Sequence, residues 1–344
     1  RGTIRSADGY VLATSVDRVA IQVNTLHLRY PDLFVASAAA TLGHGEELLR
    51  RRLAGRPRAV WLAQRAERDT GEAIRALAPA AVVLVPDSQR LYPLGSTASP
   101  VVGFVGREEL ATVGRAGLEH CFDDLLRGTP ERYLAVHDAV QRQLRLERLH
   151  TGRAGYDIDL TLNARLQAVC EAELDRAVNS LDARAASAVV LEAHSGDLLA
   201  LASMPSFDPS APADVSPARW RLRPVQDAFE PGSTVKPLIA AAALAAGVVQ
   251  HGEVFDCRQR GIDVAGVWIR DHADPGLYTI DQVVAQSANA GIIAAAQRLP
   301  EQLLWQTMDA FGFGRRTGLG FPAETGGMLM TPRRWSRISF AGLA

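Results

Sequence analysis

Short β-prone runs and helix-prone runs alternate along this chain, and the alternation constrains the fold more than any other feature. From Gly2 to about Val23, β-prone residues flank the turn signal Asp8-Gly9, which predicts a strand, a tight turn and a strand. Patterns rich in alanine and leucine then predict three helices, at 33–42, 46–53 and 66–77, and Ala81–Val85 is typical of a buried strand. The first part of the chain is therefore expected to mix α and β structure.

A charged stretch from Gln141 to Arg153 closes in Gly152-Arg153-Ala154-Gly155 and indicates a domain boundary near residue 155. A length of 344 residues also suggests roughly two domains. Beyond the boundary, we expect a strand at Tyr156–Leu162 and a helix that Asn163 caps and that runs to Val178. A hairpin should follow, with strands at 187–192 and 198–203. We therefore predict domains at 1–155 and 156–344.

The composition excludes several functional classes. Hydrophobic residues make up 47% and charged residues 22% of the chain, as in an ordinary globular protein, and the net charge is −1. Arginines are dispersed rather than gathered in a stripe, so no nucleic-acid partner is expected. Three widely spaced cysteines form neither a disulfide framework nor a metal-ligand pattern: Cys121, Cys170 and Cys257. We expect no metal and no cofactor.

No stretch reaches the roughly 18–20 apolar residues that span a bilayer, since the longest candidate, Pro237–Val249, has about a dozen. As given, the chain is predicted to be soluble. It begins at Arg1 without a methionine and ends at Ala344 within a Ser-Phe-Ala-Gly segment. We therefore expect both ends to be cut, with targeting or anchoring sequence lost upstream.

Lys236 is the only lysine. Lysine and arginine total 37, and every other one of them is arginine. Arginine stays protonated at any working pH, whereas a partly buried lysine can lose its proton and act as a base. The retained lysine therefore indicates proton transfer, and Ser233 lies three residues before it.

Pro231-Gly232 interrupts the chain just before Ser233, and Leu238–Val248 has a helical pattern. Ser233 and Lys236 are therefore expected in the first turn of a helix, where side chains at i and i+3 share a face and can hydrogen-bond. A lysine kept neutral by desolvation could then take the proton of a serine nucleophile. The alternative is a serine cap with a lysine in the first turn, but there a cation is electrostatically misplaced.

A second short element, Ser287-Ala288-Asn289, follows further along the chain. By itself such a tripeptide is weak evidence and is more often a turn or a helix cap. It gains value from its position after the Ser233 segment.

These motifs resemble those of the class B penicillin-binding proteins, most of all the division-specific type known as penicillin-binding protein 3. Glu230–Pro237 fits the nucleophile motif of that family without a mismatch. Ser6-Ala7 departs from the family, which usually has an Asp-Arg pair there. Other segments match along nearly the whole chain: Arg1-Gly2-Thr3-Ile4 with Gly9 and Leu12-Ala13, Arg90-Leu91-Tyr92-Pro93, Gly117-Leu118-Glu119, Leu162 with Arg165-Leu166-Gln167, Pro205-Ser206-Phe207-Asp208-Pro209, Leu299-Pro300 through Trp305, Gly312-Phe313-Gly314, Thr317-Gly318 and Gly320-Phe321-Pro322-Ala323-Glu324.

The resemblance implies an α+β fold, with a mixed α/β pedestal or dimerisation domain before a transpeptidase domain built on an antiparallel sheet flanked by helices. It also implies a serine D,D-transpeptidase that cross-links peptidoglycan stem peptides ending in D-Ala-D-Ala. Ser233 would form the acyl-enzyme with Lys236 as its base. Ser287 would relay a proton, and Asn289 would orient Lys236 and the substrate amide. β-Lactams would acylate the same serine.

The third motif of the family, Lys-Thr/Ser-Gly on a core strand, is absent. Two look-alikes, His150-Thr151-Gly152 and Arg316-Thr317-Gly318, have the wrong order or context. The domain is therefore expected to be truncated before that strand. Loss of one oxyanion-hole donor costs roughly 10²–10³ in rate, so we expect the chain as given to be inactive.

Three hypotheses stay open: a septal transpeptidase, a serine β-lactamase or D,D-carboxypeptidase, and a non-catalytic assembly module for cell division. Other polar residues receive structural interpretations. His272 is expected in a surface loop, while Asp208 and Glu230 are expected in turns or in supporting contacts.

The resemblance further implies an inner-membrane protein, with one N-terminal helix that these residues do not include and a catalytic body in the periplasm. Its implied partners are a glycan polymerase of the SEDS family and other division proteins.

Overall fold

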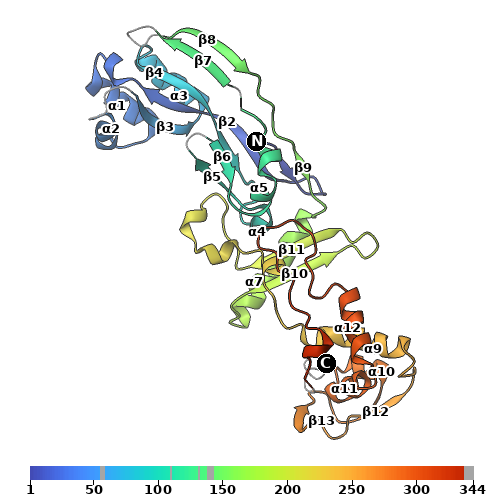
Figure 1. Cartoon of the computed structure of the whole chain (residues 1–344). Helices are drawn as coiled ribbons and strands as arrows, with labels where there is room; N and C mark the ends of the chain where they lie inside the picture. The colour runs from blue at the N-terminus through green and yellow to red at the C-terminus, as the bar shows by residue number, and fades with distance from the viewer. Residues whose placement is uncertain (55–58, 109–110, 131, 138–142, 337–344) are drawn as a thin grey trace. The chain divides into compact units, whose positions relative to one another are not determined.

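The computed structural model describes residues 1–54, 59–108, 111–130, 132–137 and 143–336 (Figure 1). It divides into two compact units, Arg1–Pro224 and Val225–Ala344. This division separates regions by compactness alone, and the predicted boundary between sequence domains near residue 155 stays a prediction. The two units are described one at a time.

A five-stranded sheet organises the first part of unit 1. Its strands are β1 (Ile4–Arg5), β2 (Val11–Val23), β3 (Val60–Ala66), β4 (Val82–Leu91) and β9 (Ile158–Asp159). Their order is β3-β2-β1-β9, with β4 also paired to β2, and every pair except the parallel β1–β9 is antiparallel. The predicted turn at Asp8-Gly9 is confirmed, because the Ser6 N–H donates to the Tyr10 carbonyl (2.9 Å) and Gly9 has a φ of +84°.

The three helices predicted for this region are present as α1 (Pro31–Leu42), α2 (Glu46–Leu53) and α3 (Arg68–Leu77). Their buried side chains Phe34, Leu49 and Ile74 pack in one apolar core with Ile21 of β2. Helix α1 ends at Gly43, which adopts the left-handed conformation that glycine allows at low cost. The amphipathic pattern of the sequence thus becomes a layer of helices on a sheet.

A buried network of ion pairs holds the N-terminal residue, Arg1. Glu119 accepts hydrogen bonds from Arg1 and Arg90, both at 2.6 Å, and Arg1 also pairs with Asp123 at 2.6 Å. Glu119 is completely buried, and so its charge requires these partners. The network ties the first residues to the short helix that carries Glu119, α5 (Gly117–Cys121).

The rest of unit 1 consists of smaller elements. They are η1 (Thr25–His27), α4 (Ser99–Val102), β5 (Val105–Glu108), β6 (Ala111–Gly114), α6 (Asp123–Arg127), β7 (Arg132–His137), β8 (Gln143–His150), α7 (Ala164–Ser180), β10 (Ala186–Leu191), β11 (Leu198–Met204), η2 (Pro212–Asp214) and η3 (Pro217–Trp220). The short helix α8 (Arg223–Gln226) follows at the division between the units.

Two predictions for the region after residue 155 are confirmed and one is corrected. Asn163 caps α7 and accepts the Leu166 N–H at 2.9 Å, and β10 and β11 form the antiparallel hairpin that the sequence predicts. The strand predicted at Tyr156–Leu162 shrinks to the two residues of β9. Only a short segment there pairs with β1, because the edge of β1 itself is two residues long.

Unit 2 is a helical core with two small two-stranded antiparallel sheets, of which one is a hairpin. Its elements are η4 (Gly232–Val235), α9 (Lys236–Ala245), β12 (Val254–Asp256), β13 (Gly261–Val264), β14 (Val267–Arg270), β15 (Leu277–Thr279), α10 (Ile280–Ala285), α11 (Asn289–Ala296), α12 (Glu301–Ala310) and η5 (Pro332–Arg334). Ile239 of α9, Ile292 of α11 and Leu304 of α12 are fully buried against one another in a single cluster. Strand β13 pairs with β14, and β12 pairs with β15.

Within the described ranges, no helix combines the length and the apolar character that crossing a membrane requires.

Candidate active site

Ser233 lies in η4, a 3₁₀ turn, and its side chain is exposed. The expected helical turn at Ser233 and Lys236 is present, but it is a 3₁₀ turn that runs directly into α9. In an α-helix, the Ser233 carbonyl would accept the N–H of residue 237, but Pro237 has none and its ring would clash with that carbonyl. The Lys236 N–H donates to the Ser233 carbonyl instead, which is the tighter bond of a 3₁₀ turn, and α9 begins at Lys236.

The Lys236 side chain is 1% exposed, the largest fully buried side chain among the described residues. Its Nζ donates to the Ser287 carbonyl (2.8 Å), to Ser287 Oγ (3.1 Å) and to Asn289 Oδ1. These three acceptors match the three donors of an ammonium group. The structure thus brings together three of the four predicted site residues. Within the part of the chain that the structure describes, the Ser233 hydroxyl is not among the Nζ partners.

Burial lowers the pKa of Lys236 below its ordinary value, and the negative charge of Asp271 acts in the opposite direction. Burial disfavours an ammonium because the interior solvates its charge poorly, so the neutral amine forms more readily than in water. A lowered pKa increases the fraction of neutral lysine at a given pH, and the neutral amine is the form that accepts a proton. The electrostatics of the site therefore agree with a base, while the three contacts of Nζ describe its protonated form.

Ser287 adopts a left-handed backbone conformation with a φ of +54°. Such a conformation costs a non-glycine residue on the order of 1–3 kcal/mol and persists where surrounding contacts hold it. Here the Ser287 and Ala288 N–H groups donate to the Val284 and Val283 carbonyls at the end of α10. The resulting turn presents both the carbonyl and the hydroxyl of Ser287 to Lys236.

Asp271 is a residue of this site that sequence reasoning missed. One of its carboxylate oxygens accepts the Asn289 N–H and the other accepts the Ala290 N–H, each at 2.9 Å, at the start of α11. The carbonyl of the preceding residue, Arg270, accepts Asn289 Nδ2 at 2.8 Å. The end of β14 therefore holds both the backbone and the side chain of Asn289.

The sequence offers little signal for this role. Asp271 stands 18 residues before Asn289 along the chain, and no short motif links the two. Its neighbour His272 is exposed, as expected for a loop residue. The one available hint is that Asp271 directly follows a β-prone run and that no helix begins just after it.

The other polar candidates lie in structural positions. Asp208 accepts the Ser210 N–H at 2.8 Å in a turn, and Glu230 is exposed. All three cysteines are free thiols. Across the residues that the structure describes, no group of three or more His, Cys, Asp or Glu side chains could hold a metal ion.

Neither look-alike of the third motif lies on a strand of unit 2. His150 is the last residue of β8 in unit 1. Thr317 lies in a loop, where its N–H (2.6 Å) and hydroxyl (2.5 Å) both donate to Glu324. Its polar groups therefore serve to close that loop.

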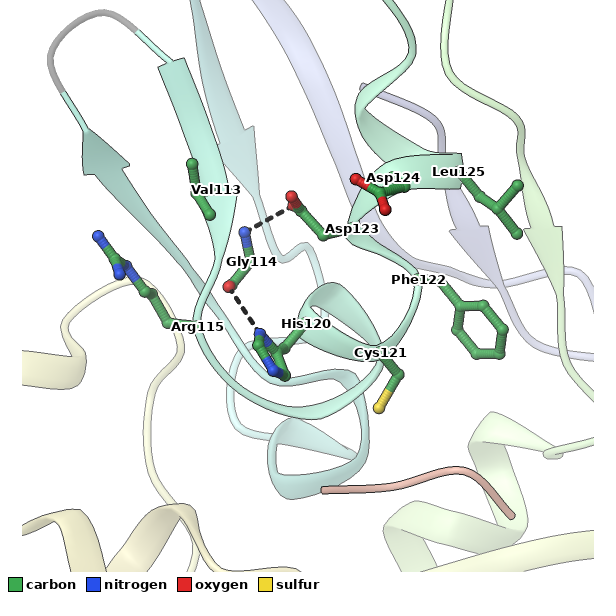
Figure 2. A pocket seen from close by; sticks show the side chains of 9 residues that line it. All are labelled: Val113, Gly114, Arg115, His120, Cys121, Phe122, Asp123, Asp124 and Leu125. Atoms are coloured by element: carbon green, nitrogen blue, oxygen red, sulfur yellow. Dashed lines mark hydrogen bonds between the residues drawn. The ribbon is translucent and has the colours of Figure 1, made fainter. Parts of the chain in front are cut away.

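A cavity of about 440 Å³ opens in unit 1 beside α5, α6 and β6 (Figure 2). Figure 2 shows the His120 ring directed at the Gly114 carbonyl (3.2 Å), while Asp123 accepts the Gly114 N–H (2.7 Å). None of the four predicted site residues lines this cavity. The candidate active site is therefore the exposed serine and the buried lysine cluster, rather than this cavity.

Comparison with known families gives the arrangement a context. Residues 1–160 match the penicillin-binding protein dimerisation domain, and residues 186–344 match the penicillin-binding protein transpeptidase domain. The chain belongs to the class B penicillin-binding proteins, and within them it is of the FtsI-like kind.

Among its relatives, the peptidoglycan D,D-transpeptidase FtsI of Escherichia coli K12 is 32% identical over 284 residues, which are 83% of this chain and 47% of the relative. The probable peptidoglycan D,D-transpeptidase PenA of Neisseria gonorrhoeae is 30% identical over 356 residues, covering all of this chain and 59% of PenA. The chain spans about half the length of the curated relatives that it matches.

Solved structures agree on the fold. Penicillin-binding protein 2X of Streptococcus thermophilus superimposes with a TM-score of 0.81 at 22% identity, over 99% of this chain and 55% of that protein. A peptidoglycan synthetase of Bifidobacterium adolescentis gives a TM-score of 0.70 at 23% identity, over all of this chain and 67% of that protein. The expected α+β architecture, a mixed α/β domain followed by a transpeptidase domain, is confirmed.

Proposed function

We propose that the protein containing this chain is a peptidoglycan D,D-transpeptidase of septal cell-wall synthesis, acting through an acyl-enzyme on Ser233. The observation that carries the proposal is the buried ammonium of Lys236, held by Ser287 and Asn289 three residues after an exposed serine. The names of its relatives, FtsI and PenA, support the reaction class.

In this reaction, the Ser233 hydroxyl attacks the carbonyl of the D-Ala-D-Ala bond as its proton passes to the neutral form of Lys236. The tetrahedral intermediate then collapses, the bond to the terminal D-Ala breaks, and the leaving amine takes up a proton. An amine from a neighbouring stem peptide attacks the ester, forms the cross-link and releases Ser233. A β-lactam would acylate the same hydroxyl when its ring opens.

The contacts of Lys236 support a route for the proton. The Ser287 carbonyl and Asn289 Oδ1 can only accept hydrogen bonds, whereas the Ser287 hydroxyl both accepts and donates. Ser287 Oγ is therefore the one of the three contacts that can pass a proton between Lys236 and the leaving amine. Asn289 would fix the direction of Nζ, since its own amide is held by Arg270.

The proposal extends to location and partners. We expect the whole protein in the bacterial inner membrane, anchored by an N-terminal helix outside this chain, with its catalytic body in the periplasm. A glycan polymerase of the SEDS family and other division proteins are the proposed partners. The FtsI-like relationship supports these expectations.

Fluorescent penicillin labelling tests the activity in the complete product of the reading frame, and Ser233→Ala is its control. Stable labelling that disappears in Ser233→Ala supports the transpeptidase, while rapid hydrolysis of the drug would support a β-lactamase or carboxypeptidase. The dimerisation domain matched over residues 1–160 favours the first outcome. No labelling of the complete product would support a non-catalytic assembly module. The 344-residue chain, which lacks a Lys-Thr/Ser-Gly motif, is expected to label poorly.

A further inference from the structure

Three hydrogen bonds connect the end of β14 to the start of α11, where Asn289 contacts Lys236. Both carboxylate oxygens of Asp271 accept N–H groups from the first two residues of α11, and the Arg270 carbonyl accepts the side-chain amide of Asn289. Asn289 Oδ1 in turn accepts a hydrogen bond from Lys236. A continuous chain of hydrogen bonds therefore joins the β13–β14 hairpin to the proposed base.

Asp271 satisfies N–H groups that a helix cannot satisfy by itself. The first N–H groups of α11 have no partner within the helix, and the residue before it, Ala288, has no side chain that could accept them. A carboxylate is favourable at this position for two reasons. It offers two acceptor oxygens, and its negative charge is favoured at a helix N-terminus. An asparagine at position 271 would keep one acceptor and lose the charge.

The charges around Lys236 are few. Asp271 is the charged group, among the described residues, whose Coulomb interaction raises the pKa of Lys236 against the effect of burial. Helix α9 contributes no charged side chain besides Lys236, and α11 contributes none. Cys257 packs behind Gly291 of α11, and burial together with Asp271 raises its pKa, so that this thiol stays neutral near pH 7.

Other charged side chains lie on elements packed against α9 or α11, namely Asp281 on α10, Glu301 and Asp309 on α12 and Asp256 on β12, and further ones lie along the hairpin. Arg270 and His272 flank Asp271 along the chain, and both are exposed. The backbone carbonyl of Arg260 accepts the Asp271 N–H (2.9 Å). Solvent screens exposed charges far more than buried ones. Asp271 is therefore the charge through which the hairpin acts on the site.

We propose that Asp271 is a positioning residue of the acyl-transfer site, which aligns Asn289 with Lys236 and supplies the counter-charge of the buried ammonium. This inference rests on the proposed function for its catalytic meaning, but the electrostatic part concerns the folded chain alone. It assigns a role to the β13–β14 hairpin, which contains none of the four motif residues.

The single lysine allows a direct test. Because Lys236 is the only lysine, ¹³C-labelled lysine gives one NMR signal in the 344-residue chain prepared without lysine in a tag, and its pH titration reports the protonation of Nζ. The variants Asp271→Asn and Asp271→Ser remove the charge and keep a group that can cap a helix. We expect both to move the titration of Lys236 to lower pH, since a lost anion disfavours the ammonium form.

Asp263→Asn is the matched control. Asp263 lies on the same hairpin and is exposed, and among the described residues it accepts only a turn N–H, that of Gly266 (3.1 Å). It should leave the titration of Lys236 where it is in the wild type. An unchanged titration in folded Asp271→Asn or Asp271→Ser, or an equal shift in Asp263→Asn, overturns the proposal. If neither uncharged variant folds, the role of Asp271 is structural and the proposal fails as well.

Acylation of the complete product then measures the catalytic part. The rate of penicillin acylation is measured as a function of pH. In Asp271→Asn, the rising part of this profile should move to lower pH. Its plateau should fall by about 10²-fold, since a misplacement of about 1 Å has that effect. Asp271→Glu retains the charge and should restore the position of the rising part. If the wild type is not acylated, the proposed function fails while the lysine titration still decides the role of Asp271.

Discussion

Replacing Asn289 by alanine should detach the proposed base from the β13–β14 hairpin. The Asn289 side chain makes two hydrogen bonds, one accepted from the charged Nζ of Lys236 and one donated to the Arg270 carbonyl at 2.8 Å. A bond to a charged group contributes about 1.5–3 kcal/mol and a neutral bond about 0.5–1.5 kcal/mol. The bond to Lys236 is the better shielded of the two, because Lys236 is 1% exposed while the bond to Arg270 faces solvent. We expect unit 2 to lose about 2–4.5 kcal/mol of stability.

The assay is urea unfolding of the chain, followed through the single ¹³C-lysine signal, which reports unit 2 because Lys236 lies there. Gln286→Ala is the control, since Gln286 is exposed on the same segment and a surface substitution usually changes stability by less than about 0.5 kcal/mol. An unfolding midpoint of Asn289→Ala equal to that of Gln286→Ala would refute the reasoning, because it would mean that Lys236 is anchored without Asn289.

Two further predictions concern the same cluster. Ser287→Ala should lower the free energy of unfolding by about 1–3 kcal/mol, because it removes an acceptor of the Lys236 ammonium. Ser287→Gly should lower it by about 1 kcal/mol less, since glycine adopts the +54° φ without strain. Urea unfolding compares the two variants, and equal losses of stability would contradict a strained Ser287. The lowered pKa of Lys236 means that the unfolded chain binds more protons between that pKa and the ordinary value of 10.5. The Lys236 contribution to stability is therefore least favourable below the folded pKa and improves as pH rises toward 10.5. Lys236→Met should remove this pH dependence, and urea unfolding between pH 6 and 10 should detect the difference; identical slopes in both proteins would count against the buried ammonium.

Local patterns along the chain were sufficient to predict much of the first unit. The boundaries of α2 match the predicted 46–53, and Asn163 caps α7 as expected, because both features depend on residues within about one helical turn. The strand near residue 156 is shorter than the pattern predicts, because pairing with the two-residue β1 sets its length. A propensity pattern contains no information about the length of its partner.

The sequence by itself determined the motif residues and their local geometry. Pro237 is a clear case, since its missing N–H excludes the α-helical bond to the Ser233 carbonyl, which accepts the Lys236 N–H in a 3₁₀ turn instead. The retention of one lysine among arginines identified the proposed base for a chemical reason, because only lysine can be neutral at working pH.

Only the tertiary structure decided how that lysine is held. Its ammonium contacts residues more than 50 positions away, and these are positioned in turn by Asp271, which no motif marks. Hydrogen bonds between distant segments depend on how helices and hairpins pack, and packing is a property of the whole core around α9 and α11. The sequence thus identified Lys236 as the candidate base, and the fold supplied its burial, its acceptors and its counter-charge.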